Sequence, residues 1–260
     1  MPLLWEGKPY RHAVAKQLAH SDACSVLDLA TGDGWLAASL PKGVAIDGVD
    51  LFQAIPPPGY RTFVRADINK GLPPQLGRYD AIVCCEAIAY LTNPGNFLDS
   101  IAAHLNPGGI VIISTPNPLY IGSRLLIMLR GCFPGFSYFL KNSGAAAHMP
   151  WSALGWPQLW FLLGQSGFGE IKMLDVPEKK PKHFWEALMG LPAMLYCKGK
   201  ARKSSTSNEN RFWGFAGSKQ HLFGRRLVVC ARLAANTGAD IPRANLNPTS
   251  ANQDPTRQNA

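Results

Sequence analysis

A glycine turn that follows a carboxylate is the part of this sequence best suited to chemistry. Residues 25–37 read Ser-Val-Leu-Asp-Leu-Ala-Thr-Gly-Asp-Gly-Trp-Leu-Ala: an apolar run, a Gly-x-Gly turn, and then residues that favour a helix. Gly32 and Gly34 lack Cβ, so the backbone there can adopt a positive φ and a ligand can approach it closely. A helix after such a turn directs free N–H groups at whatever lies over it. The stretch therefore predicts a nucleotide-type cofactor site.

The carboxylate of Asp28 separates two classes of cofactor. Gly32-x-Gly34-x-x-Ala37 matches the dinucleotide fingerprint G-x-G-x-x-G/A, which is a weak signal by itself. A pyrophosphate over the turn would be repelled by Asp28, whereas a cofactor with a cationic amino acid end would be attracted by it. An NAD-linked oxidoreductase and an ordinary strand–helix turn without a ligand stay open as alternatives at this point.

Two stretches resemble the class I S-adenosylmethionine-dependent methyltransferases. Residues 28–34, Asp-Leu-Ala-Thr-Gly-Asp-Gly, resemble motif I (D/E-x-G-x-G-x-G), with an alanine where the family usually has its first glycine. Residues 105–117 resemble the family's L-x-PGG-hydrophobics-STPN run. The resemblance implies that the cofactor is S-adenosyl-L-methionine and that motif I binds it through Asp28, Ala30, Thr31, Gly32 and Gly34.

An acid also ends the second predicted strand, residues 43–50. At the end of that strand a carboxylate lies beside the glycine turn and can accept hydrogen bonds from both hydroxyls of a ribose. Asp50 holds the last position and Leu51 follows it, while Asp47 is a nearby competitor. Asp50 is the preferred ribose ligand because it comes last in the strand.

Two further acids follow the third and fourth predicted strands. Asp67 comes after residues 60–66, and the resemblance places it, with Ile68, near the adenine amino group. Glu86 ends residues 79–86 and matches the first acid of a family run. Ala89-Tyr90 stands where Glu-His often appears in that run, which removes one candidate base.

The predicted elements place these side chains at one edge of a sheet. Strands alternate with helices and short connections, an order that predicts a parallel sheet flanked by helices. Further strands are predicted at 110–117, 170–176 and 222–233. The resemblance implies a Rossmann-like α/β fold with seven mostly parallel strands. Ligands of such sheets bind outside the carboxyl ends of the strands, where the turn at 31–34, Asp50, Asp67 and Glu86 would gather.

The chain is predicted to form one methyltransferase domain over 1–235, with insertions at about 118–150 and 178–218. The first insertion is interpreted as a helical lid over the substrate or, equally, as a core-packed helical pair. His148 in its last part is a candidate catalytic group that acts as a base or orients the acceptor; a packing role is the alternative. Residues 236–260 are polar and contain several prolines, so a disordered tail is expected there.

Composition limits the function classes. Apolar residues make up 47% of the 260 residues and charged residues 17%, which excludes a disordered chain. Six cysteines without paired spacing indicate a reducing, cytoplasmic compartment, and six histidines without ligand spacing predict no metal. The first eight residues lack the long apolar core of a signal peptide.

The net charge of +9 is concentrated in residues 178–226, which hold eleven Lys/Arg against three Glu. An aromatic-rich segment between basic clusters suits the surface of an anionic membrane, which would place the protein peripherally on the inner face of the membrane. A solvated insertion that covers the substrate pocket is an equal alternative. Nucleic acid is disfavoured because Cys85-Glu86-Ala87-Ile88 replaces the [D/N/S]-P-P-[Y/F/W] run of amino-methylating DNA enzymes.

Together these features predict an in-line methyl transfer to a small or lipophilic acceptor, such as a lipid, a quinone or a glycan precursor. Two other classes remain open: the NAD-linked oxidoreductase, and a methyltransferase-like fold that only binds.

Overall fold

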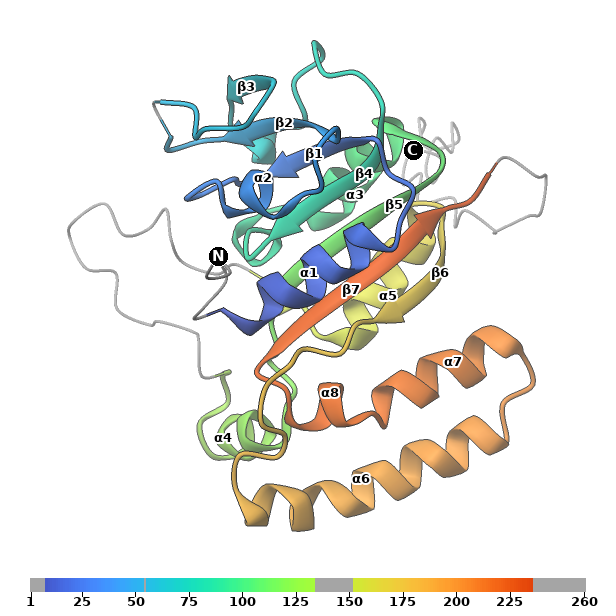
Figure 1. Ribbon diagram of the computed structural model, residues 1–260. Coiled ribbons are helices and arrows are strands. Elements are labelled where there is room, and N and C mark those ends of the chain that lie inside the picture. The colour runs from blue at the N-terminus through green and yellow to red at the C-terminus, as the bar shows by residue number, and fades with distance from the viewer. Residues whose placement is uncertain (1–7, 54, 134–151, 236–260) are drawn as a thin grey trace, which may run out of the picture.

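The computed structural model describes residues 8–53, 55–133 and 152–235 and shows a single central sheet. Its seven strands have the order β3-β2-β1-β4-β5-β7-β6 (Figure 1). The strands are β1 (Ser25–Leu29), β2 (Ala45–Asp50), β3 (Thr62–Arg65), β4 (Tyr79–Cys85), β5 (Leu105–Pro116), β6 (Phe168–Met173) and β7 (Arg226–Leu233). The predicted Rossmann-like sheet of seven mostly parallel strands is confirmed.

The first five strands are parallel, and β7 is antiparallel to both of its neighbours. The central strands β1 and β4 are almost continuously apolar because helices cover both of their faces. The parallel register brings Asp28 opposite Gly48 on β2 and Val83 on β4. All carboxyl ends of β1 to β5 therefore lie at one edge of the sheet.

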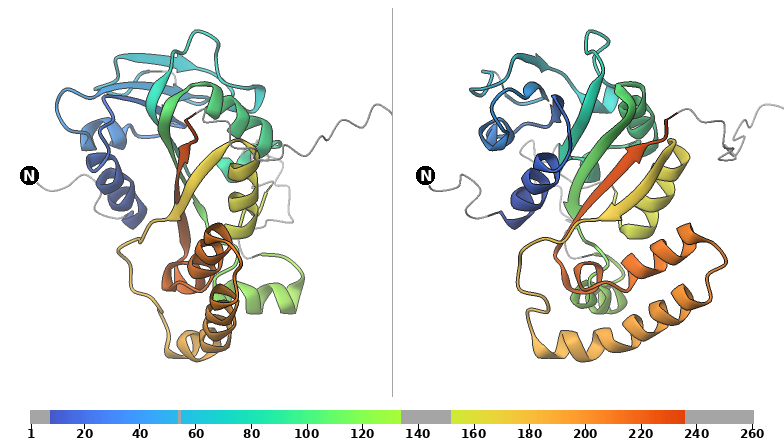
Figure 2. Two further views of the ribbon diagram at one scale, coloured as in Figure 1. Left: turned by 90° about the vertical axis from the view of Figure 1, so that its right-hand side faces the viewer. Right: turned by 45° about the vertical axis from the view of Figure 1, so that its right-hand side comes forward.

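Two helical layers cover the two faces of the sheet (Figure 2). On one face α1 (Pro9–Ala19) and α2 (Trp35–Ser39) share a core with Val26 of β1. On the other face α3 (Pro94–Ala103) and α5 (Trp156–Gln165) pack against Leu27 and Leu29. Pro9 begins α1 and Asn93 caps α3, because a helix start tolerates a missing N–H and gains from a side-chain acceptor. Two short 3₁₀ turns, η1 (Ile68–Lys70) and η2 (Ile88–Tyr90), complete this part of the chain.

A separate group of helices lies beyond the carboxyl end of β5. It contains α4 (Ile121–Arg130), α6 (Phe184–Arg202), α7 (Ser207–Ala216) and α8 (Lys219–Phe223), at the bottom of Figure 1. Its position follows from the register, because Pro116 at the end of β5 pairs with Arg226 at the start of β7. We call α4, α6, α7 and α8 the insertion helices.

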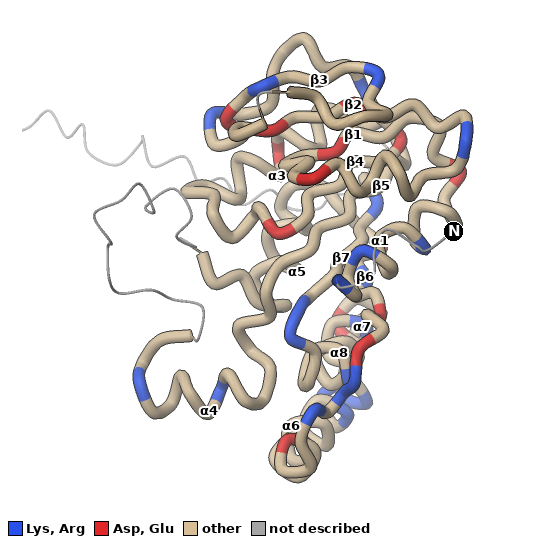
Figure 3. The backbone as a smooth tube through the Cα atoms, turned by 60° about the vertical axis from the view of Figure 1, so that its left-hand side comes forward, with Lys and Arg blue, Asp and Glu red and all other residues tan. Residues whose placement is uncertain are grey.

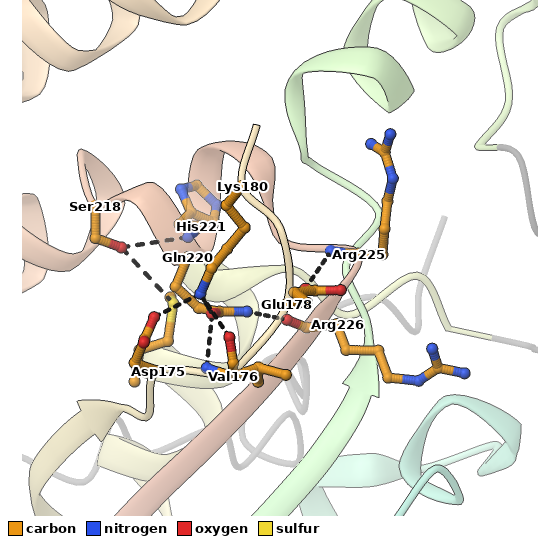
Figure 4. Close-up of polar contacts among 10 residues, drawn as sticks. Asp175, Val176, Glu178, Lys180, Ser218, Gln220, His221, Arg225 and Arg226 are labelled. Carbon is orange, nitrogen blue, oxygen red and sulfur yellow. Dashed lines mark hydrogen bonds and ion pairs between the residues drawn. The ribbon is translucent and has the colours of Figure 1, made fainter. Parts of the chain in front are cut away.

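A polar cluster joins the insertion helices to the sheet (Figure 4). The Lys180 ammonium donates to the Asp175 carboxylate, the Val176 carbonyl and the Gln220 side chain. Gln220 in turn accepts from the Val176 N–H at 2.9 Å and donates to the Arg226 carbonyl at 2.7 Å. The chain between β6 and α6 is thereby fixed against α8.

The predicted closing strand at 222–233 is wrong in its first part. Leu222 and Phe223 belong to α8, which Ser218 caps through a bond from the His221 N–H. Gly224 ends that helix, and β7 begins only at Arg226. Tertiary hydrogen bonds from Gln220 override the apolar pattern, which looks the same in a buried helix and a buried strand.

Three predictions concern residues outside those that the structure describes: the disordered tail at 236–260, the catalytic role of His148, and the part of the first insertion from 134 to 150.

Candidate functional site

The glycine turn at the end of β1 has left-handed backbone at three positions. Ala30 has φ 60°, Gly32 has φ 55° and Gly34 has φ 72°. A Cβ on Gly32 would have nothing within 4 Å, so the turn leaves open space there. A Cβ on Gly34 would lie 2.4 Å from Cβ of Pro57, so this glycine makes room for the loop between β2 and β3. Gly32 therefore leaves its backbone surface free, whereas Gly34 allows the loop between β2 and β3 to pack against the turn.

Asp50 holds the turn and the end of β2 together. Its side chain is only 7% exposed. One carboxylate oxygen accepts from the Gly32 N–H at 3.0 Å and from the Thr31 hydroxyl at 3.5 Å. The other accepts from the N–H groups of Phe52 at 2.7 Å and Gln53 at 3.1 Å. Asp50 thus faces the glycine turn, and its Thr31 contact is the longest of the four.

Asp47, the competitor of Asp50, is directed elsewhere. Its carboxylate accepts two bonds from the Arg61 guanidinium, at 3.1 and 2.6 Å, and one from the Tyr79 hydroxyl at 2.9 Å. Burial alone would raise the pKa of Asp47, but the bonds from Arg61 and Tyr79 lower it. Asp47 therefore bonds to residues just before β3 and on β4, whereas Asp50 bonds to the glycine turn.

Asp28 lies beneath the turn and is 2% exposed. The Tyr60 hydroxyl donates to its carboxyl at 2.6 Å. Burial raises the pKa of Asp28 to about 7, and the bond from Tyr60 limits that rise. The Tyr60 ring reaches Asp28 across Gly48, where a Cβ would lie 2.8 Å from the ring. Asp28 is therefore a buried, partly protonated group at neutral pH.

Tyr60 is a residue that the sequence analysis missed. It follows Pro58 and Gly59 in a loop, and nothing local marks it as a partner of a carboxyl 32 positions away. The signal that could have found it is Gly48, a glycine in the middle of a buried strand, which often marks the close approach of another group.

Glu86 joins four elements at the end of β4. Its backbone has φ 60°, and its carboxylate accepts from the Ser114 hydroxyl of β5 at 3.0 Å. Its other oxygen pairs with the Arg226 guanidinium of β7 at 3.0 Å, and that guanidinium lies 5.4 Å from the ring centre of Tyr10 on α1. Glu86 therefore lies at the sheet edge, half-buried and already paired.

Helix α1 contacts the glycine turn directly, which the sequence analysis did not predict. The Arg11 side chain is 7% exposed and donates two hydrogen bonds to the Asp33 carboxylate, at 2.9 and 2.8 Å. The same guanidinium lies 5.1 Å from the ring centre of Trp35. Burial alone would raise the pKa of Asp33, but the bonds and charge of Arg11 lower it. The turn is thus fixed from the α1 side as well.

The third acid, Asp67, lies next to the end of β2. The Ala66 N–H donates to the Asp50 carbonyl at 3.1 Å, and Asp67 caps η1 through the Asn69 N–H at 3.0 Å. Ile68 is half-buried, and Leu51 is 40% exposed. The structure therefore brings the turn, Asp50, Leu51, Asp67, Ile68 and Glu86 to one edge, where acidic segments gather around β1, β2 and β4 (Figure 3).

The strand order and this edge define the class I methyltransferase fold. The sequence matches the model of the family described as "Methyltransferase domain" over residues 5–157, more than half of the chain. The protein belongs to that family.

Solved structures share the fold at low sequence identity. A complex of the Haloferax volcanii Trm112 methyltransferase activator with a putative methyltransferase matches with a TM-score of 0.53 at 15% identity, over 88% of this chain and 91% of that one. An O-methyltransferase family protein from Burkholderia thailandensis has a TM-score of 0.53 at 13% identity, over 89% and 57%. Both agree with the fold class.

Curated relatives include ubiquinone biosynthesis O-methyltransferases. The protein from Vibrio parahaemolyticus is 30% identical over 102 residues, which cover 35% of this chain and 43% of the relative. The protein from Azorhizobium caulinodans is 29% identical over 168 residues, which cover 59% and 62%. The chain thus spans less than half of the Vibrio relative and under two thirds of the Azorhizobium one.

The described residues fit S-adenosyl-L-methionine, the cofactor of this class. The surface above Gly32 is open and a carboxylate lies beside it, and partly exposed apolar side chains stand just after β2 (Leu51) and in η1 (Ile68). These features suit a backbone-bound amino acid end, a ribose and an adenine, respectively.

Proposed function

We propose that this protein transfers the methyl group of S-adenosyl-L-methionine to a small, lipophilic acceptor. The observation that carries the proposal is the carboxyl edge of β1, β2 and β4, where the Asp50 carboxylate faces an open glycine turn. Family membership supports methyl transfer and disfavours the oxidoreductase alternative. A fold that only binds the cofactor is the alternative that the experiment below separates.

Each cofactor contact has a proposed residue. Asp50 accepts from the ribose hydroxyls, and the weak Thr31 contact is the one that they displace. The amino acid end lies along the backbone from Ala30 through Thr31 and Gly32 to Gly34, while Leu51, Asp67 and Ile68 surround the adenine. In place of the direct contact that motif I implies for Asp28, its burial and its bond from Tyr60 support an indirect role, in which it positions the backbone of the turn. Glu86 borders the site toward the acceptor.

The bound cofactor supplies an electrophilic methyl group on a sulfonium. The protein holds the acceptor in line with that methyl group and excludes water, so the gain is mainly proximity and orientation. A base is needed only for a weakly acidic acceptor. Our candidate for a residue that orients or deprotonates the acceptor is His148.

The acceptor class rests on two observations. Several relatives are named ubiquinone biosynthesis O-methyltransferases, which supports a quinone-type or other lipophilic acceptor. The insertion helices, which lie beyond the carboxyl end of β5, also expose many apolar side chains. A lipid, a quinone or a lipid-linked glycan precursor fits both.

Calorimetry with S-adenosylhomocysteine tests the cofactor site. Asp50→Asn keeps the side-chain shape but removes the charge, so binding should weaken about tenfold or more. Asp99→Asn, an exposed acid on α3, is the matched control and should bind like the wild type. Equal affinity of the D50N variant and the wild type would remove Asp50 from the site.

Methyl transfer itself is tested with labelled cofactor and a lipid extract. Label should enter the organic phase with the wild type and not with the D50N variant. Tight binding of S-adenosylhomocysteine without any transfer to lipid, quinone or glycan fractions would favour the binding-only alternative.

A further inference from the structure

The longest insertion helix, α6, exposes an apolar stripe to solvent. Phe184, Leu188, Leu191 and Leu195 are 86%, 69%, 50% and 60% exposed. Their spacing of four, three and four residues places them on one face of the helix. We call these four residues the α6 ridge.

The opposite face of α6 packs against the protein. Glu186, Gly190 and Cys197 on that face are buried, and a Cβ on Gly190 would lie 2.5 Å from the Phe223 ring of α8. The helix is therefore apolar on its exposed side as well as on its packed side. Large apolar side chains in a row on the exposed face of a helix are typical of a docking surface, so the ridge indicates a partner other than the described part of the chain.

Cations continue the line of the ridge. Lys198 and Arg202 follow Leu195 at three and seven residues, on the same face, and both are exposed. Lys200 lies 5.7 and 5.9 Å from the ring centres of Tyr196 and Trp213. The only acid in α6 is Glu186, which is 0% exposed and pairs with Arg225. The exposed surface of α6 thus combines apolar side chains with positive charge alone.

The basic excess of residues 178–226 divides into two groups. Lys180, Arg225 and Arg226 pair with Asp175, Glu186 and Glu86, respectively. The Arg225 pair joins α6 to the start of β7, and Lys180 also bonds to Gln220 of α8 (Figure 4). The other eight cations, among them Lys198, Arg202 and Lys203, take part in none of the ion pairs within the described residues. Figure 3 shows basic residues along α6 and α7, at the far end of the molecule from β3. This second group is available to an anionic partner.

We infer that the α6 ridge docks on an anionic phospholipid surface, with α6 lying in the plane of the interface. Phe and Leu side chains then enter the boundary of the acyl chains while Lys198 and Arg202 contact the headgroups. No helix within the described residues is long and apolar enough to cross a bilayer, so the contact is interfacial. Since α6 lies at the outer end of the molecule, its whole 19-residue length is accessible to a flat surface (Figure 1).

A second copy of the chain fits the ridge less well. An antiparallel pair of α6 helices would place Lys198 and Arg202 against Lys179 and Lys182, which precede the partner helix. Like charges across an interface are unfavourable, whereas anionic lipid complements both ends of the ridge. The charge pattern therefore favours lipid.

Sedimentation with vesicles tests the inference without any methyl-transfer measurement. The wild type should sediment at low salt with vesicles of equal parts phosphatidylglycerol and phosphatidylcholine, and much less with phosphatidylcholine alone. The double variant Leu188→Ser/Leu195→Ser should bind about tenfold more weakly, because it removes apolar area that the acyl chains cover. Phe161→Ser, which changes an exposed aromatic residue on α5, is the matched control and should bind normally.

The charge contribution is measured separately. Lys198→Gln/Arg202→Gln should weaken binding to the anionic vesicles about thirtyfold, at about 1 kcal/mol per cation. Lys16→Gln/Lys42→Gln changes two exposed lysines outside the insertion helices and should bind like the wild type. Added salt should reduce wild-type binding toward that of the K198Q/R202Q variant.

Three outcomes overturn the inference. The first is wild-type protein that stays in the supernatant with anionic vesicles at low salt. The second is ridge variants that sediment as well as the wild type. The third is a wild-type dimer in solution that the L188S/L195S variant converts to a monomer, which would make the ridge a self-association surface. Unchanged binding of S-adenosylhomocysteine by each variant shows that it is folded and keeps this test independent of the proposed reaction.

Discussion

The cofactor edge and the insertion helices are built on opposite principles. At the edge of β1, β2 and β4, Asp28, Asp50 and Glu86 are bonded to partners from the chain itself. On α6, by contrast, large apolar side chains and cations face solvent. The first arrangement preorganises a small site, because each carboxylate is fixed before any ligand arrives. The second leaves apolar surface exposed to water, and only an external partner can cover it and so stabilise the complex.

The largest effect is expected at the joint between the two regions. Glu186 is fully buried and accepts from the Arg225 guanidinium at 2.6 Å and from the Lys182 N–H at 2.9 Å. Glu186→Gln leaves the Arg225 charge without its partner and should cost about 3–5 kcal/mol. Hydrogen exchange should show the loss mainly in α6.

The matched control for this variant is Glu170→Gln, which breaks the exposed pair with Arg232 and should cost under about 1 kcal/mol. Equal exchange throughout α6 in the E186Q variant and the wild type would mean that the insertion helices do not depend on this pair.

At the cofactor edge, Asp28 should make stability depend on pH. Burial raises its pKa from 3.8 to about 7, so the folded state binds the proton more tightly than the unfolded state does. Its stabilising contribution is complete below pH 4 and is lost as the pH rises through about 7. Asp28→Asn is neutral at every pH and should not show this loss. As the pH rises from 4 to 8, the free energy of unfolding of the variant should therefore increase by roughly 4 kcal/mol relative to that of the wild type.

Denaturant unfolding at several pH values measures this difference, with Asp99→Asn as the control for an exposed acid. If the free energies of unfolding of the D28N variant and the wild type differed by the same amount at every pH in that range, Asp28 would be charged in the folded state throughout.

The glycine turn offers a direct comparison of packing with open space. Gly34→Ala combines a left-handed backbone with a Cβ 2.4 Å from Pro57 and should cost about 3 kcal/mol. Gly32→Ala meets no atom within 4 Å and should cost only the backbone strain, about 1 kcal/mol. Thermal unfolding separates the two.

Binding of S-adenosylhomocysteine should show the opposite ranking. When each variant is folded, Gly32→Ala should weaken this binding more than Gly34→Ala does. If Gly34→Ala proved the more harmful for binding, the open surface would have to be reassigned to Gly34.

The smallest effect is expected for the pair that joins α1 to the turn. Asp33 is 61% exposed at its side chain, so water screens its interaction with Arg11. Asp33→Asn should therefore cost at most about 1 kcal/mol, although both hydrogen bonds are well formed. Chemical denaturation measures the change, and a loss above about 2 kcal/mol would indicate that α1 is held mainly by this pair.

Much of the sheet edge that carries the glycine turn could be predicted because its signals are local. The apolar run before Gly32 and the acids at the end of β2 and just after β3 and β4 are short patterns with a direct backbone meaning. The strand predicted at 110–117 begins too late, because residues 106–109 belong to β5, which begins at Leu105. Of the two candidate ribose ligands, only Asp50 faces the turn, and its role toward a ribose stays a prediction. By contrast, the Tyr60–Asp28 and Arg11–Asp33 pairs join residues 32 and 22 positions apart, and no local pattern marks such pairs.

The insertion helices show that a count of charged residues along the sequence does not distinguish paired cations from exposed ones. In the sequence, residues 178–226 form one basic block, and every Lys and Arg in it has the same weight. In the fold, Arg225 and Lys180 bond to α6 and α8, respectively, Arg226 pairs with Glu86 beside β4, and the cations at the end of α6 face outward.

The sequence by itself determined the alternating strands and helices, the glycine turn and the acids at the strand ends, because backbone preference and hydrophobic period act over a few residues. Only the tertiary structure decided which acids are buried or paired, where α8 gives way to β7, and which side of α6 faces solvent. These properties depend on contacts between distant segments, and burial and pairing, which set a side chain's charge and exposure, arise only when those segments meet.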